Sequence, residues 1–279
     1  MNCQRVGNVW VLLCLCMGCR HSGGPGTAVT VEQFGLEESA RDHPVVSGAI
    51  AIASDVLSPA AKVALGAGWK QPPAGAVPVF AVTGTGLSQR EIMTTYVECR
   101  CVIVQAEVLP AWLAKYQGSG ESLLSVEVPL ILAYMLLHEA GHIARGEAFK
   151  TGLDEASRRD SGGREEQKPL EAAADEFAAD SIIAAMAEKG TARGLAASRI
   201  AVALAQLSWN LSAHRLLDDF GGTALRKRTL FQDAGLSHPN LEWRILRVNA
   251  LISRTPAANS LLEQFENARS AGPMYRLLP

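Results

Sequence analysis

Two histidines and a glutamate stand together in "LHEAGHIARGE", the segment from Leu137 to Glu147. His138 and His142 are four residues apart, so on a helix both imidazoles lie on one face, with Glu139 beside them. Neutral imidazoles bind zinc, and an adjacent carboxylate that does not ligate the metal can take a proton from a water molecule that the metal activates. The spacing therefore predicts a zinc-dependent hydrolytic site with Glu139 as its general base.

A third ligand, a carboxylate, histidine or cysteine, must come from another element. A second helix is predicted to begin at Pro169, and Glu171 and Asp175 share one of its faces. Two like charges at this spacing destabilise a helix by about 0.2–0.5 kcal/mol unless a cation compensates them. Glu176 and Asp180 repeat the spacing about 140° round the helix, so only one of the two pairs can face a metal.

The first helix is predicted from Pro129 to Gly146, because proline is tolerated in a first turn and glycine can end a helix. It is apolar nearly all round, which predicts burial in protein, and its uninterrupted apolar stretch is too short to span a membrane. Residues 147–168 are polar without an apolar period and are predicted to form a loop that covers the site. Further helices are predicted from Pro169 to Gly190 and over about residues 195–217.

Residues 77–109 carry two β-branched runs, which predict a hairpin or a small sheet, and residues 42–69 predict one or two short helices. The fold class is therefore α+β, mainly α, with a buried helix that carries the two histidines. The run from Glu98 to Gln105 is predicted to be the edge strand of the cleft, to which an extended peptide can add by main-chain hydrogen bonds. Cys99 and Cys101 are predicted to be two buried small residues, because side chains two apart on a strand are parallel and poorly placed for a disulfide.

The N-terminal residues are predicted to lie outside the fold. An apolar run from Val9 to Gly18 has the length of a signal peptide, and "CMGC", which ends in Cys19, resembles a bacterial lipobox. Residues 1–18 are therefore expected to be a signal peptide, residues 19–44 a flexible tether and residues 45–279 a single domain. We expect export to the bacterial periplasm with a lipid anchor on Cys19, and plain secretion is the alternative.

The charge balance bears on partners. The chain has 26 basic and 28 acidic residues, so its net charge predicts no positive electrostatic field that would attract nucleic acid or an anionic membrane. The only compact basic cluster, Leu225–Arg228, lacks interleaved aromatic residues and is interpreted as a solvated helix end or loop. We expect a protein or peptide substrate, no nucleic acid, and membrane contact only through a lipid on Cys19.

The motif "HEAGHI" followed by "EAAADEFAAD" resembles the gluzincin zinc metallopeptidases, in particular the HtpX-like and CAAX-prenyl-protease-like group. The resemblance implies a zincin-like metallopeptidase domain. It also implies that Glu171, rather than Glu176, is the third zinc ligand beside His138 and His142. Asp175 would then accept a hydrogen bond from a ligand histidine and fix its tautomer.

A third segment, "SHPNLEWRI" from Ser237 to Ile245, is similar to the His-Pro motif with a downstream Arg-Ile that these families carry. It implies that His238 and Arg244 lie near the metal and help to stabilise the tetrahedral oxyanion, or that His238 approaches the zinc when substrate is absent. The resemblance covers roughly Val102 to Val248. Prenyl proteases have many transmembrane helices and HtpX-like proteins have a pair of them, and neither arrangement is predicted for this sequence. A soluble or lipid-tethered periplasmic member of the group is therefore expected.

The expected function is that of a zinc-dependent endopeptidase of envelope proteins. His138, His142 and Glu171 would hold the zinc and leave one position open, while Glu139 acts as base and then as proton donor to the leaving amine. The alternative is a zinc-binding envelope chaperone or scaffold without turnover. Glu139 weighs against it, because a structural zinc site has no use for a free carboxylate and normally has four protein ligands.

Overall fold

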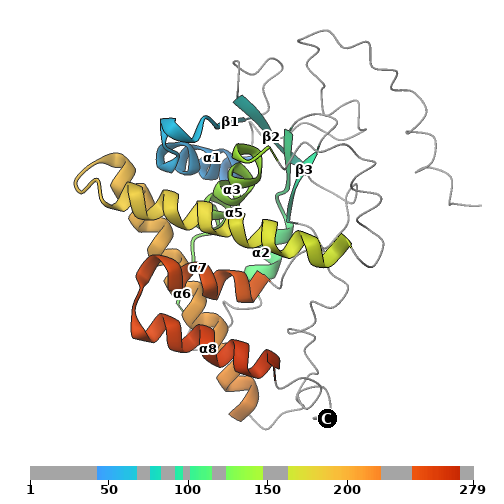
Figure 1. Ribbon diagram of the computed structural model, residues 1–279, viewed down its shortest axis with the longest axis vertical. Helices are drawn as coiled ribbons and strands as arrows, with labels where there is room; N and C mark the ends of the chain where they lie inside the picture. The colour runs from blue at the N-terminus through green and yellow to red at the C-terminus, as the bar shows by residue number, and fades with distance from the viewer. Residues whose placement is uncertain are drawn as a thin grey trace, which may run out of the picture.

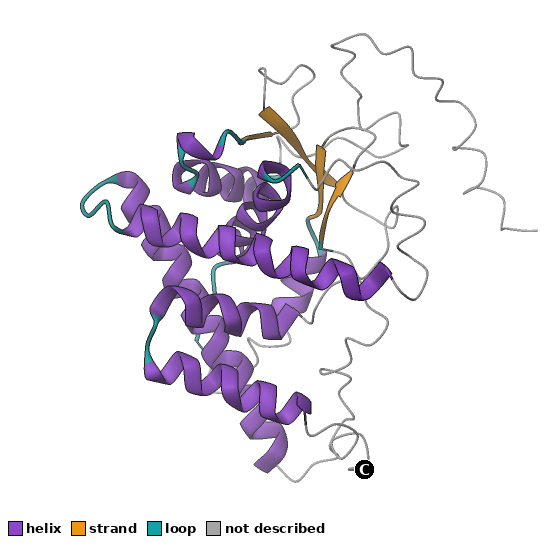
Figure 2. Ribbon diagram, in the orientation of Figure 1, coloured by secondary structure: helices purple, strands orange, loops and turns teal. Residues whose placement is uncertain are grey.

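The computed structural model describes residues 43–67, 76–82, 92–96, 101–114, 124–146, 163–220 and 241–270. These residues are mainly helical and include one small sheet (Figure 2), so the predicted α+β, mainly α class is confirmed. Helices α1 (Pro44–Val56) and α3 (Val128–Ala144) lie beside the sheet, and α5 (Gly163–Met186) crosses in front of them (Figure 1). Helices α7 (Leu241–Ser253) and α8 (Pro256–Ser270) follow below α5. The predicted signal peptide, residues 19–42 of the predicted tether, Leu225–Arg228 and His238 lie outside the described residues. The last residue of the predicted tether, Pro44, begins helix α1.

The sheet has four strands in the order β1-β2-β4-β3, namely Ala64–Ala67, Ala76–Val82, Cys101–Gln105 and Met93–Tyr96. β1, β2 and β4 are parallel, and β3 is antiparallel to β4. The predicted small sheet is confirmed, but the prediction that residues 98–105 form the edge strand is wrong. β4 lies between β2 and β3 and all of its residues are buried, as expected for a nearly continuous apolar run. Among the described strands, β3 is the edge strand at this end of the sheet.

Residues 42–69 contain more than the predicted helices. Helix α1 spans Pro44–Val56 and is followed by a short 3-10 turn, η4, at Pro59–Ala61, but Ala64–Ala67 form strand β1. Pairing with β2, which lies farther along the chain, decides this assignment. A local pattern of small residues does not reveal such pairing.

Helix α3, Val128–Ala144, matches its predicted range, with a proline in its first turn and Gly146 at φ +69° just beyond its end. It is buried nearly all round and shares one hydrophobic core with β2, β4, α1 and α6. Within the described ranges, we find no helix whose length and apolar character would let it cross a membrane.

Helix α5, Gly163–Met186, begins six residues before the predicted start and contains Pro169 in its interior. The predicted loop is therefore wrong for residues 163–168. Residues 164–168 are strong helix formers, which extend the helix although the proline forfeits one main-chain hydrogen bond. Residues 147–162, the rest of the predicted lid, lie outside the described residues.

The remaining helices are α2 (Val108–Leu113), α6 (Ala192–Phe220), α7 (Leu241–Ser253) and α8 (Pro256–Ser270). α6 confirms the helix predicted over residues 195–217 and extends beyond it at both ends. α7 packs against both α5 and α6, and its Arg244 contacts His138 of α3 and Asp175 of α5.

Cys101, at the start of β4, is fully buried, as predicted, but it is disulfide-bonded. Its partner is a cysteine outside the described residues. The prediction of two free, buried cysteines assumed one continuous strand through Cys99 and Cys101. The described strand begins at Cys101, and Cys99 lies outside the described residues.

Candidate metal centre

Helices α3 and α5 approach each other closely at Gly141, inside the His-Glu-x-x-His segment. A Cβ atom on Gly141 would lie only 3.1 Å from the Cα of Ala174 and from the Cβ of Phe177 on α5. Only glycine therefore permits this helix spacing without a shift. Ala174 lies one turn after Glu171, so the close approach brings Glu171 to the histidine pair.

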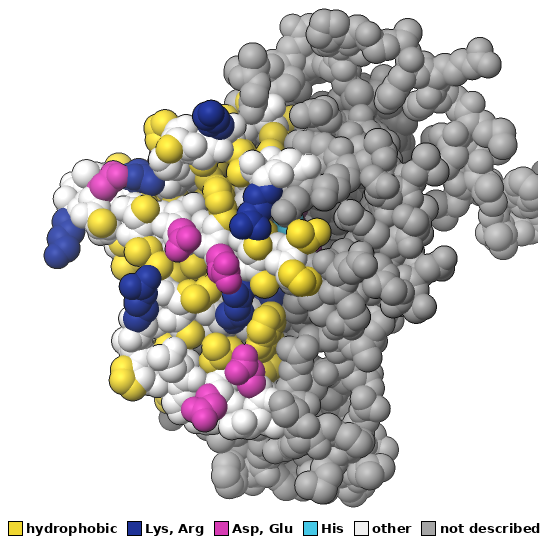
Figure 3. All heavy atoms as spheres, viewed as in Figure 1, with side chains coloured by type: hydrophobic (Ala, Val, Ile, Leu, Met, Phe, Trp, Pro, Cys, Tyr) yellow, Lys and Arg dark blue, Asp and Glu magenta, His cyan; other side chains and the backbone are white. Residues whose placement is uncertain are grey.

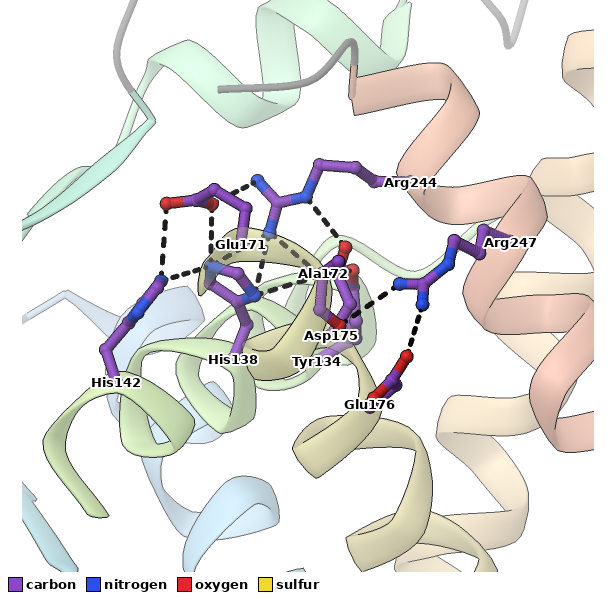
Figure 4. A network of polar contacts seen from close by, with 9 residues as sticks. All are labelled: Tyr134, His138, His142, Glu171, Ala172, Asp175, Glu176, Arg244 and Arg247. Carbon is purple, nitrogen blue, oxygen red and sulfur yellow. Dashed lines mark hydrogen bonds and ion pairs between the residues drawn. The ribbon is translucent and has the colours of Figure 1, made fainter. Parts of the chain in front are cut away.

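Three ligand atoms converge between the two helices (Figure 4). The Nε2 atoms of His138 and His142 are 3.1 Å apart, and the two oxygens of Glu171 lie 3.2 Å from Nε2 of His138 and 3.4 Å from Nε2 of His142. Ligands bound at 2.0–2.1 Å in a tetrahedron are about 3.3 Å from one another. The nearest contacts come close to this value, but the two His–Glu distances involve different oxygens of Glu171. With one atom from each residue, the ligand atoms lie within 4.8 Å of one another, so within the described residues this trio could hold a metal ion.

The charge of the site also favours a cation. His138, Glu171, Asp175 and Arg244 are all buried, with exposed fractions between 0% and 8%. These side chains bring two carboxylates and one guanidinium together in a buried position. Buried charge is costly unless it is paired or coordinates a metal, so a bound cation would stabilise this group.

Asp175 organises the side of the site away from the ligand atoms. Its Oδ1 accepts hydrogen bonds from the Tyr134 hydroxyl and from Nδ1 of His138, both at 2.9 Å. Arg244 donates to both carboxylate oxygens, from Nη2 at 2.9 Å and from Nε at 3.1 Å. The donation from Nδ1 of His138 to Asp175 puts the lone pair of Nε2 on the ligand side, where Nη2 of Arg244 lies 2.9 Å from it.

The same network fixes the charges. Burial alone would raise the pKa of Asp175, but the Arg244 guanidinium and the hydrogen bond from His138 outweigh it and hold this pKa well below its usual range. Burial would lower the pKa of Arg244, and the carboxylate of Asp175 raises it instead. Burial and the neighbouring Asp175 raise the pKa of Tyr134 well above its ordinary value, so its hydroxyl stays a donor.

Arg244 comes from α7 and lies beside the ligands, as the sequence resemblance implied. Its Nη1 is 3.4 Å from Glu171, and its Nη2 is 2.9 Å from Nε2 of His138. With these contacts and the pair of bonds to Asp175, the guanidinium supports the ligand set. This geometry favours a positioning role for Arg244 over the predicted oxyanion role.

The competing acidic pair lies elsewhere on α5. Glu176 is exposed and forms an ion pair with Arg247 of α7, whose Nη1 also donates to the main-chain carbonyl of Ala172 at 3.1 Å. α5 thus presents Glu171 and Asp175 to the histidines, while Glu176 helps to hold α7 against α5 (Figure 4).

Glu139 is half-buried beside the ligands, and its Oε2 accepts a hydrogen bond from the hydroxyl of Thr95 on β3. Sequence reasoning missed Thr95, Tyr134 and Gly141. Thr95 lies 44 residues away in the sequence and carries no local signal. Tyr134 stands one helical turn before His138, and Gly141 is a glycine inside a helix, so their spacing could have marked both as candidates.

No family model matches the chain, and neither the curated proteins nor the solved structures contain a significant match to it.

Proposed function

We propose that the protein is a zinc-dependent endopeptidase of the gluzincin kind. One observation carries the proposal: ligand atoms of His138, His142 and Glu171 lie within 4.8 Å of one another, and the carboxylate of Glu139, which is not one of the three candidate ligands, follows His138 on the same helix. A purely structural zinc site closes its fourth position with a protein ligand, whereas a catalytic site has three. The short motifs that resemble gluzincins point to the same chemistry.

The donor set favours zinc among the common metals. Two imidazole nitrogens and one carboxylate oxygen suit zinc in tetrahedral geometry, whereas magnesium and calcium prefer sets of oxygens. When bound, zinc would polarise a water molecule and the carbonyl of the scissile peptide bond.

The protein's own residues would carry the proton. Glu139 takes a proton from the attacking water as the water oxygen bonds to the carbonyl carbon, and it then delivers that proton to the amine when the C–N bond breaks. Asp175 holds the tautomer of His138, and Arg244 holds Asp175.

The sheet provides a place for a peptide. Gln105 donates to the carbonyl of Ile92 at 2.9 Å, and Ile92 is opposite Gln105 in the β3–β4 register. Hydrogen-bonded pairs alternate along an antiparallel ladder, so Met93 and Thr95 point their N–H and C=O groups away from β4. An extended substrate can pair with these groups as an added strand, beside Glu139. The predicted substrate edge therefore moves from β4 to β3.

The described face of the molecule shown in Figure 3 gives no support to a nucleic-acid partner. On the face formed by α5, α7 and α8, basic and acidic side chains are interspersed and neither sign forms a patch (Figure 3). A protein or peptide substrate remains the proposal.

We further propose that the protein acts in the bacterial periplasm, tethered by lipid on Cys19. The apolar run from Val9 to Gly18 supports this location, as does the disulfide of Cys101, because disulfides persist in oxidising compartments. Cells fed radiolabelled palmitate should label the native protein and not Cys19→Ala. Equal labelling of the two proteins would reject the anchor.

The test of the enzymatic proposal compares the native protein with Glu139→Gln, using fluorescein-labelled casein and a mixed peptide library as substrates. We expect hydrolysis by the native protein and a loss of at least about a hundredfold in Glu139→Gln, with the zinc content of the two proteins equal. Zinc in both proteins and hydrolysis by neither would instead support the zinc-binding chaperone or scaffold.

A further inference from the structure

We infer that Thr95 is a positioning residue that couples peptide docking on β3 to the orientation of Glu139. The inference rests on the proposed function and goes beyond it, because it assigns a residue that no motif marks. The main chain of Thr95 takes part in peptide docking, and its hydroxyl takes part in the orientation of Glu139.

The hydroxyl makes the first link. Thr95 Oγ1 donates a hydrogen bond to Oε2 of Glu139. Within the described part of the chain, this is the one hydrogen bond that the Glu139 side chain makes. Glu139 is half-buried, and a glutamate side chain has several rotatable bonds, so without this contact its carboxylate would sample several orientations. With Oε2 held, Oε1 is the oxygen left to accept a proton. A catalytic group must stay within about 0.5 Å of its productive position, and one charge-assisted hydrogen bond provides this constraint.

The main chain makes the second link. Thr95 is opposite Val102 at a position of the β3–β4 ladder where the two strands do not exchange hydrogen bonds. Its N–H and C=O therefore point away from β4, to the side of β3 on which no described strand pairs and an added strand could bind. A peptide that pairs there fixes the backbone of Thr95 and, through it, the hydroxyl that holds Glu139.

Two substitutions separate the hydroxyl from the rest of the side chain. Thr95→Val keeps the shape and the β-branched Cβ and removes only the donor, whereas Thr95→Ser keeps the donor. Both variants and the native protein are measured for zinc content, for kcat and KM on fluorescein-labelled casein, and by crystallography for the position of the Glu139 carboxylate.

We expect Thr95→Val to keep its zinc and its KM, to lose roughly ten- to hundredfold in kcat, and to show Glu139 turned away from its native position. Thr95→Ser should retain a kcat close to the native value and the native Glu139 position. Native kcat in Thr95→Val, or an unmoved Glu139 carboxylate in its crystal structure, would overturn the inference. The crystallographic readout decides even if the native protein leaves casein uncut, an outcome that counts against the proposed function instead.

Discussion

Replacing Gly141 by alanine tests whether the spacing of α3 and α5 builds the metal site. The new Cβ would lie 3.1 Å from Ala174 Cα and Phe177 Cβ and 3.2 Å from the carbonyl oxygen of Ala174, whereas ordinary contacts begin at 3.4 Å. The helices must therefore separate by at least about 0.3 Å. Metal–ligand distances tolerate only about 0.2 Å, and Glu171 moves with Ala174 because both lie on the same helix.

We expect the affinity of Gly141→Ala for zinc to fall about 10- to 100-fold, the range found when the support of a ligand is disturbed. The fold itself should survive. Overpacking lowers the free energy of unfolding by about 1–3 kcal/mol, whereas the higher helix propensity of alanine raises it by about 1 kcal/mol. The free energy of unfolding should therefore drop by only about 0–2 kcal/mol.

Zinc affinity is measured by competition with a chromogenic chelator, and stability by urea unfolding of the metal-free protein. Gly48→Ala in α1 is the matched control, because a Cβ at Gly48 meets no atom within 4 Å. It should raise the free energy of unfolding by about 0.5–1 kcal/mol and leave the zinc affinity unchanged. Native zinc affinity in Gly141→Ala would refute the idea that this helix spacing positions Glu171.

Two further substitutions probe the buried support of the ligands. Arg244→Leu leaves the Asp175 carboxylate buried without its cation, so urea unfolding of the metal-free protein should show a loss of about 3–5 kcal/mol, and a loss under about 1 kcal/mol would contradict the assigned ion pair. Tyr134→Phe removes one of four hydrogen bonds to Asp175 and should cost about 1–2 kcal/mol in the same assay. Its zinc affinity should stay within about tenfold of native because the bond between Asp175 and His138 remains, and a larger loss would show that Tyr134 is indispensable to the ligand set.

Local periodicity predicts much of the site. The spacing of His138 and His142 is a property of one helix, and so is the spacing of Glu171 and Asp175, so the sequence alone places both pairs on helix faces. That the two helices face each other was an expectation from the motifs, and the structure brings the pairs together.

Features that depend on distant contacts could not be predicted in this way. β1 and the order of β4 and β3 follow from strand pairing between segments far apart in the chain. Thr95 reaches Glu139 only because β3 packs across α3. Proline is common in first turns, which favoured a helix start at Pro169, yet the helix formers before it extend α5 upstream.

The account depends most directly on the zinc content of the purified protein, measured by elemental analysis for the native chain beside Glu171→Ala and Glu139→Gln. We predict about one zinc per chain in the native protein and in Glu139→Gln, and a marked loss in Glu171→Ala, because two imidazoles alone hold zinc weakly. Native protein without zinc, or Glu171→Ala that keeps it undiminished, would contradict the metal centre of His138, His142 and Glu171.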